Sequence, residues 1–181
     1  MRYYLIIVLF LSQTAFADQA STFIIPSKTH VSTFTLPSGV QIKIVEKPFS
    51  KSLFKISSCG DYRPACRING RAAFGAVDEI PKTFVSMISV LYQGHSYLLD
   101  SSGMYNAWGR RTFETKGGAR YFGGWCYNAN YCQFRGLFSD GGGSFAAEWQ
   151  VVNGVSTRTV LTYSFDVVKL FMEYIDPPKY E

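Results

Sequence analysis

The chain has 181 residues, of which 47% are apolar and 17% aromatic, and its formal charge is +5. This apolar content is ordinary for a globular protein and argues against intrinsic disorder. Basic residues are scattered, and Arg110-Arg111 is the only adjacent pair. A chain without a basic run interleaved with aromatics does not have the pattern of a nucleic-acid-binding protein.

The N-terminus has the three parts of a secretory signal peptide. Arg2 gives a positive start, residues 3–11 are apolar, and Ala15-Phe16-Ala17 matches the small-x-small cleavage pattern. No later stretch has about 18 consecutive apolar residues, as a spanning helix would need. We therefore expect a cleaved signal peptide over residues 1–17 and one exported β-rich domain over residues 18–181, located in a bacterial periplasm.

The first half of the mature chain is predicted to hold short strands joined by turns. Alternating apolar residues flank Pro37-Ser38-Gly39, which predicts a hairpin of residues 31–36 and 40–46. Ser52–Ser57 resembles a further short strand. Asn69-Gly70 is a dipeptide typical of a two-residue hairpin turn.

The stretch Thr83–Trp108 is the one around which we expect the fold to be organised. It reads as a strand, a Gln93-Gly94 turn, a second strand and a polar tip at Asp100-Ser101-Ser102-Gly103. Apolar residues occupy both parities of the first strand, which predicts that both of its faces are covered, as in the middle of a sheet. The tip is interpreted either as a binding loop on a rigid support or as an ordinary connection.

The second half is rich in glycine and aromatic residues, which suits short strands in a sandwich, a barrel or a small propeller-like fold. Asn153-Gly154 lies between two runs of alternating apolar residues and predicts a hairpin. A helix follows, with Ser164 as its cap and an apolar face formed by four side chains. These are Val167, Leu170, Phe171 and Tyr174. The expected fold is an all-β or β-rich single domain of short antiparallel strands with one C-terminal helix.

Four cysteines, an even number in an exported chain, predict two disulfides. Three pairings are possible. We favour Cys59–Cys66 and Cys126–Cys132, because each pair brackets a loop rich in turn-forming residues. The spacings C-x6-C and C-x5-C differ from those of zinc sites.

Catalytic motifs are weak. Ser101 or Ser102, His95 and Asp100 are the residue types of a hydrolytic triad, but they share one hairpin and no G-x-S-x-G elbow surrounds the serines. For glycoside hydrolysis, the acids nearest the aromatic segment are scattered and form no motif. They are Glu114, Asp140 and Glu148. We expect a protein that is not an enzyme and has no metal or other cofactor.

Carbohydrate binding is the alternative that the aromatic residues suggest. Exposed aromatic rings can stack on sugar faces, but large aromatics in a short-stranded β protein are more often part of the core. The candidates are Trp108, Tyr121, Trp125 and Tyr127. An exposed row of these rings would favour a secreted carbohydrate- or cell-wall-binding module.

Three features together resemble a known family. They are the signal peptide followed by LPSGVQIKIVEKPF (Leu36–Phe49), the hairpin YLLDSSGM (Tyr97–Met104) and the aromatic, glycine-rich second half. This layout is similar to that of the periplasmic immunity proteins of bacterial type VI secretion, and in particular to those that neutralise peptidoglycan amidase effectors of the Cys-His type. The resemblance covers most of the mature chain.

The resemblance implies a toxin–antitoxin pair, in which a polar loop of the immunity protein enters the active-site cleft of the amidase and inhibits the enzyme. Here the loop would be Asp100, Ser101, Ser102 and Gly103, with the two serine hydroxyls bonding the catalytic histidine. Apolar contact would come from Met104, Tyr105 and Trp108, and a charged rim from Arg110 or Arg111. No nucleic acid or membrane insertion is implied.

Overall fold

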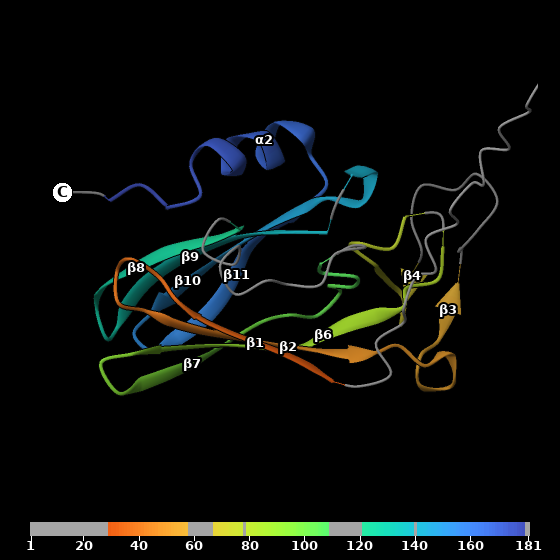
Figure 1. The fold of residues 1–181 in the computed structure, drawn as a ribbon, viewed down its shortest axis with the longest axis horizontal. Coiled ribbons are helices and arrows are strands. Elements are labelled where there is room, and N and C mark those ends of the chain that lie inside the picture. Colours follow the sequence, from red (N-terminus) through yellow and green to blue (C-terminus); the bar gives the residue numbers. More distant parts are fainter. Residues whose placement is uncertain (1–28, 58–66, 78, 109–120, 140, 180–181) are drawn as a thin grey trace, which may run out of the picture.

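The computed structural model describes residues 29–57, 67–77, 79–108, 121–139 and 141–179, and within them it is an antiparallel β protein (Figure 1). Two four-stranded sheets have the orders β1-β2-β6-β7 and β11-β10-β9-β8, and a small third sheet has the order β3-β4-β5. The expectation of a β-rich fold of antiparallel strands with a helix near the C-terminus is confirmed.

The first sheet contains the two hairpins predicted around residues 37–39 and 93–94. Gln93 and Gly94 both have positive φ angles, 47° and 81°, as the two-residue hairpin turn requires. The strands of this sheet are β1 (His30–Thr35), β2 (Gln41–Pro48), β6 (Thr83–Tyr92) and β7 (His95–Leu99).

A β-bulge in β6 explains why both parities of this strand carry apolar residues. Val85 pairs with Glu46 and Met87 pairs with Val45, so Ser86 is an extra residue, and its hydroxyl donates to the Val45 carbonyl at 3.0 Å. A bulge shifts the inward-facing residues from one parity to the other. The inward residues are Val85, Ile88 and Val90, whereas Leu91 on the outer face is 41% exposed. The prediction that both faces of this strand are covered is therefore wrong for Leu91.

The second sheet contains the hairpin predicted around Asn153-Gly154, whose φ angles are 51° and 77°. The glycine-rich segment before it supplies the other hairpin of this sheet and the short 3-10 helix η2 (Gly141–Gly143). The strands are β8 (Phe122–Asn128), β9 (Tyr131–Phe138), β10 (Phe145–Val152) and β11 (Val155–Thr162).

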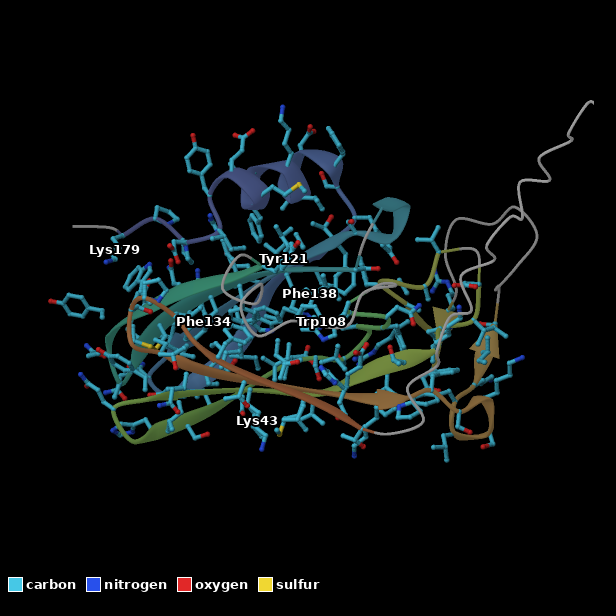
Figure 2. The ribbon with its side chains drawn as sticks, in the orientation of Figure 1. Lys43, Trp108, Tyr121, Phe134, Phe138 and Lys179 are labelled. Atoms are coloured by element: carbon cyan, nitrogen blue, oxygen red, sulfur yellow. A yellow bond between two sulfur atoms is a disulfide. The ribbon has the colours of Figure 1, made fainter. Side chains whose placement is uncertain are left out.

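The two large sheets face each other across the main core, so the fold is a sandwich. Phe34 of the first sheet meets Phe122 of the second edge to face, with ring centroids 6.1 Å apart. Trp149 lies stacked on Phe122 at 5.9 Å and is fully buried. Figure 2 shows Phe134, Phe138 and Trp108 between the sheets. Aromatic pairs in these geometries stabilise a core beyond the area that they bury.

The helix α2 (Phe165–Glu173) covers the outer face of the second sheet (Figure 1). Val168 and Phe171 are its buried residues, and they pack against Leu137 and Ala146 of the sheet. The predicted helix is confirmed, but its predicted apolar face is rotated. Its members Leu170 and Tyr174 are exposed.

The start and the packing of α2 depend on different side chains than predicted. Ser164 occupies the N-cap position, but its hydroxyl makes no capping hydrogen bond. Arg135 of β9 lies 4.5 Å above the Phe171 ring and donates to the Tyr174 carbonyl at 3.2 Å. An ion pair of 2.7 Å with Glu148 holds Arg135 in place.

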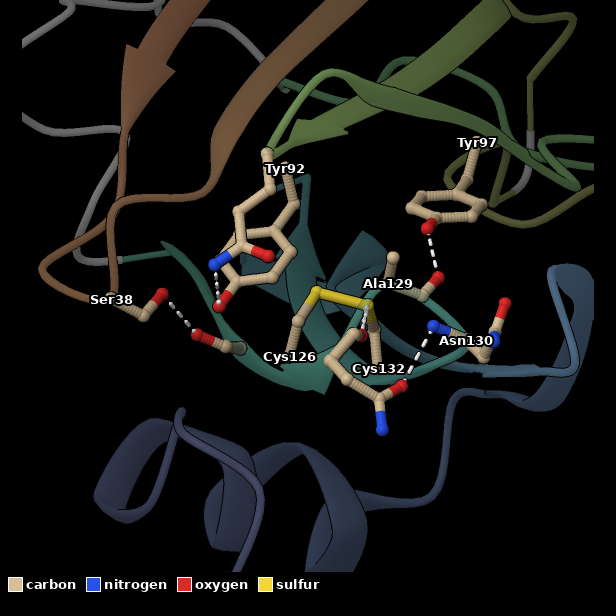
Figure 3. The surroundings of a disulfide bond; sticks show 10 residues. Ser38, Tyr92, Tyr97, Cys126, Ala129, Asn130 and Cys132 are labelled. Carbon is tan, nitrogen blue, oxygen red and sulfur yellow. Dashed lines mark hydrogen bonds between the residues drawn. A yellow bond between two sulfur atoms is a disulfide. The ribbon is translucent and has the colours of Figure 1, made fainter.

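One end of the sandwich is closed by a disulfide and by hydrogen bonds between the sheets (Figure 3). The predicted bond Cys126–Cys132 is present, and it joins β8 to β9. The Ser38 hydroxyl donates to the Gly124 carbonyl at 2.7 Å, and the Tyr97 hydroxyl donates to the Ala129 carbonyl. The predicted pair Cys59–Cys66 lies outside the described residues.

The three-stranded sheet lies at the opposite end of the molecule from the β1–β2 turn (Figure 1). Asn69 and Gly70 form its tight turn as predicted, with φ angles of 53° and 76°. The strand predicted over Ser52–Ser57 is shorter than expected, because its first residues belong to a 3-10 helix. The elements are η1 (Lys51–Leu53), β3 (Ile56–Ser57), β4 (Arg67–Ile68) and β5 (Arg71–Ala72). Among the helices of the described residues, none has the length and apolar character to cross a membrane.

Candidate binding surface

The segment that follows β7 is the predicted loop, and it is hydrogen-bonded into the fold along its length. The Phe74 amide donates to the Gly103 carbonyl at 2.8 Å, and the Tyr105 amide donates to the Phe74 carbonyl at 2.8 Å. On its other side, the Val85 amide donates to the Met104 carbonyl at 3.0 Å. The expectation of a tip that hangs from the hairpin is therefore wrong: the segment runs between Phe74 and the start of β6.

The first four residues of this segment form a tight turn, which we call the Asp100–Gly103 turn. The Ser102 amide donates to a carboxylate oxygen of Asp100 at 2.9 Å, and the Met104 amide donates to the Ser101 carbonyl at 3.2 Å. Gly103 has a φ angle of +79°, and a Cβ there would lie 3.2 Å from the Ala72 carbonyl oxygen. Glycine takes this conformation without steric cost.

Two side chains of the second sheet hold the turn against the sandwich. Trp149 of β10 and Arg158 of β11 are directly opposite each other in the register. The Trp149 indole N–H donates to the Asp100 carbonyl at 2.9 Å, and an Arg158 Nη donates to the same oxygen at 3.2 Å. Arg158 also donates to the Ser102 carbonyl at 2.6 Å. The turn is thus held by bonds within the chain itself.

The predicted contact residues differ in their exposure. Asp100 and Ser102 are exposed, whereas Ser101, Gly103 and Trp108 are half-buried. Met104 and Tyr105 are only 1% and 7% exposed. Their expected role as outer apolar contact area is wrong, because Met104 belongs to the main core and Tyr105 to a smaller aromatic core. Arg110 and Arg111 lie outside the described residues.

Charges around the turn come from one carboxylate and two guanidinium groups. Arg158 lies 3.1 Å from a carboxylate oxygen of Asp100, and Arg71 of β5 donates to the Ser102 hydroxyl at 3.4 Å. Burial alone would raise the pKa of Asp100, but the Ser102 hydrogen bonds and the charges of Arg158 and Arg71 together lower that pKa below 3.8. Burial lowers the pKa of Arg158, the Asp100 charge opposes this change, and the nearby Arg71 charge adds to it.

A pocket of about 390 Å³ lies on the side of the turn that faces the three-stranded sheet. Its polar lining comes from Ser101, Ser102 and Gly103 of the turn and from Asn69 and Arg71 of the three-stranded sheet region, and Arg71 reaches the Ser102 hydroxyl. The remaining residues that line it are apolar or aromatic. They are Phe54, Ile68, Phe84, Val85, Met104 and Tyr105.

The structure separates the residues of the hypothetical triad. His95 begins β7 and Asp100 follows its end, so at about 3.3 Å per residue the two backbones are about 16 Å apart. His95 is exposed beside the Gln93-Gly94 turn. His95 therefore lies beyond hydrogen-bond reach of Ser101 and Ser102 and does not serve as their base. Within the described ranges, no group of three metal-ligating side chains is found.

The aromatic candidates for carbohydrate binding are divided between core and surface. The buried Trp125 ring donates its indole N–H to the Pro177 carbonyl at 3.0 Å, and Trp108 packs against Phe138 at 5.9 Å. Tyr127 is 80% exposed and Tyr121 is also exposed. These two tyrosines are thus the exposed members of the four aromatic residues considered for carbohydrate binding. Of the three acids considered for hydrolysis, Glu148 is paired with Arg135, whereas residues 114 and 140 lie outside the described residues.

Arg71 and Arg158 are the residues of this surface that the sequence analysis did not identify. The Asn153-Gly154 turn contains the signal for Arg158, because the hairpin register places residue 158 opposite Trp149. No family model, curated protein or solved structure matches the chain.

Proposed function

We propose that this chain is a periplasmic immunity protein that binds and inhibits a peptidoglycan-degrading amidase of the Cys-His type. The Asp100–Gly103 turn and its exposed side chains Asp100 and Ser102 form the centre of the contact. The turn acts as a fixed polar edge that covers the entrance of the amidase cleft, and Ser102 bonds a polar group there. Catalysis by this chain itself is not part of the proposal.

The observation that carries the proposal is the rigidity of a polar, exposed turn. Hydrogen bonds from Trp149, Arg158 and Phe74 fix three of its carbonyl groups. A surface that is ordered before binding loses little conformational entropy when the complex forms, which favours tight inhibition. The Cys126–Cys132 disulfide is compatible with an oxidising compartment.

The proposal is tested by capture of the partner with two matched variants. A tagged protein spanning residues 18–181 is incubated with periplasmic and secreted fractions of its own bacterium, and the bound proteins are identified by mass spectrometry after a high-salt wash. We expect a Cys-His amidase in near-equal amount. Ser102→Trp should reduce its recovery at least tenfold, because the indole blocks close approach at the centre of the contact.

Ser96→Trp is the control, because Ser96 is an exposed strand residue on β7 and tryptophan is well accepted in strands. This variant should capture as much amidase as the unchanged protein. Equal recovery with Ser102→Trp would contradict a contact at the turn. Recovery of cell-wall fragments without an amidase would contradict the immunity function and favour the carbohydrate-binding module.

A further inference from the structure

The pocket beside the Asp100–Gly103 turn has a pre-formed aromatic floor. Phe54 meets Phe84 edge to face with centroids 5.4 Å apart, and both rings line the pocket. Phe49 stacks on Phe54 at 4.5 Å and meets Tyr105 edge to face at 5.8 Å. These contacts hold the floor in one arrangement. The volume of about 390 Å³ is within the range of small-ligand sites.

The polar residues that line the pocket offer hydrogen-bond donors. The Asn69 side-chain oxygen already accepts from the Lys55 amide at 2.9 Å, so the group that Asn69 can offer to an occupant is its NH2. Ser101 and Ser102 contribute hydroxyl groups to the lining. Arg71 contributes a guanidinium with five N–H donors, and its one hydrogen bond within the described residues is to the Ser102 hydroxyl.

The charge of the lining favours an anionic group. Asp100 is the acidic residue of this cluster, and Arg158 pairs with it at 3.1 Å. Arg71 has no carboxylate within 4.0 Å among the residues that the structure describes. Asp100 and Arg158 form their ion pair outside the lining, so Arg71 is the charged residue among those that line the pocket, next to apolar side chains. A guanidinium binds a carboxylate through two parallel hydrogen bonds.

We propose that this pocket binds the C-terminal residue of a peptide that ends in an apolar side chain. The side chain lies on the Phe54–Phe84 floor, the terminal carboxylate pairs with Arg71, and Asn69 and the serine hydroxyls bond the neighbouring peptide group. This binding does not require the amidase, so it goes beyond the proposed inhibition.

The test is a titration of the 15N-labelled protein, disulfide intact, with N-acetyl-phenylalanine, followed by NMR. We expect saturable shifts at the amides of Ser101–Tyr105 and of the β4–β5 turn. N-acetyl-phenylalaninamide lacks the carboxylate and should bind about tenfold more weakly, which is the effect of one charged hydrogen-bonded pair. N-acetyl-alanine keeps the carboxylate but should also bind more weakly, because it buries little apolar area.

Two arginine variants distinguish binding in the pocket from a general effect of positive charge. Arg71→Gln should bind the acid and the amide equally. Arg67→Gln removes an exposed guanidinium on β4, and Arg67 is not among the residues that line the pocket, so this variant should keep the tenfold preference. Absence of saturable shifts, shifts confined to another surface, equal binding of acid and amide by the unchanged protein, or the same loss in both variants would overturn the proposal.

Discussion

Arg158 shows how one half-buried charge positions the candidate surface. Its guanidinium lies on the same side of the second sheet as the buried Trp149, since the two residues are opposite in the register. A cation in such a place needs partners, because burial of an unpaired charge is costly. It finds them in the Asp100 carboxylate and in the carbonyl groups of Asp100 and Ser102. The position of the turn therefore follows from the need of Arg158, on β11, for hydrogen-bond and charge partners.

Burial of Glu46 has a consequence that can be measured. One of its carboxylate oxygens accepts from the Thr83 hydroxyl at 2.5 Å and from the Ala107 amide at 3.1 Å. Burial raises the pKa of Glu46 above its ordinary value of 4.5, although these two hydrogen bonds and the His30 charge oppose the change. The carboxylate joins β2, β6 and the segment after the Asp100–Gly103 turn.

We predict that Glu46→Gln changes the pH dependence of stability. Between pH 4.5 and the raised pKa of the folded state, the native protein binds more protons at this site than the unfolded chain, so Glu46 lowers the unfolding free energy as pH rises. Glutamine keeps the oxygen acceptor and does not titrate. The stability of the variant relative to the unchanged protein should therefore rise from pH 4 to pH 8 in urea unfolding. A constant or falling difference would show that Glu46 does not titrate in this way.

Gly75 is a residue at which the structure allows no side chain. Its φ angle is +85°, and a Cβ would lie 1.9 Å from the Tyr105 carbonyl oxygen. We predict that Gly75→Ala lowers the unfolding free energy by about 3 kcal/mol, because the backbone bridge between the Phe74 segment and Tyr105 must separate. Gly142→Ala is the control, since a Cβ there has no atom within 4 Å. Equal stability of the two variants in thermal unfolding would contradict the close approach.

At the scale of elements, the hairpins could be predicted from local sequence, whereas the buried faces of β6 and α2 could not. The dipeptides Gln93-Gly94, Asn69-Gly70 and Asn153-Gly154 all adopt positive φ angles. Glycine has no Cβ to oppose the conformation that the turn needs, and asparagine tolerates it. The bulge at Ser86 could not be predicted, because a bulge is defined by two residues that face one partner on another strand.

The helix α2 shows why an apolar pattern can predict an element and yet give the wrong face. Its sequence FDVVKLFME contains apolar residues on most sides, so several stripes fit the helical period. Contact with Leu137 and Ala146 selects the side of Val168 and Phe171, and the cation–π contact of Arg135 with Phe171 supports it. Both partners belong to other elements, and their positions cannot be read from the helix sequence.

The Cys126–Cys132 bond is the element-scale feature with the clearest energetic effect. Its cysteines are 6 residues apart, and closure of so short a loop stabilises the folded state by about 2 kcal/mol in the chain-entropy model. We predict this loss for the double variant Cys126→Ser, Cys132→Ser in denaturant unfolding. Because Ser38 and Tyr97 still join the sheets at this end, the variant should keep the native fold. An unchanged unfolding free energy would contradict the stabilising role of the bond.

At the scale of the whole molecule, the candidate surface forms where three parts of the chain meet. The Asp100–Gly103 turn follows the first sheet, Arg71 belongs to the three-stranded sheet, and Arg158 belongs to the second sheet. Ser102 is 31 residues from Arg71 and 56 from Arg158. The sequence alone identified the turn, whose polar residues are adjacent. It could not identify the two arginines as its neighbours, because only the packing of the sheets brings them together.

The sandwich also determines what the turn can do. The segment after it is bonded to Phe74 on one side and to β6 on the other, so Met104 and Tyr105 lie in the cores, and Asp100 and Ser102 are the exposed residues of the turn. Under the proposed function, inhibition would come from a fixed edge that covers a cleft, because a turn bonded on both sides does not enter a cleft as a flexible loop would. Fixed contact surfaces give slow dissociation when they are complementary to the partner.

The most direct test of this account is a stoichiometric inhibition assay with the captured amidase. Hydrolysis of purified peptidoglycan is followed while the protein is added, with Ser102→Trp and Ser96→Trp in parallel. We expect activity to fall to zero near one equivalent of the unchanged protein and of Ser96→Trp, whereas Ser102→Trp should require at least ten times more. Undiminished hydrolysis at an excess of the unchanged protein, or equal inhibition by both variants, would contradict it.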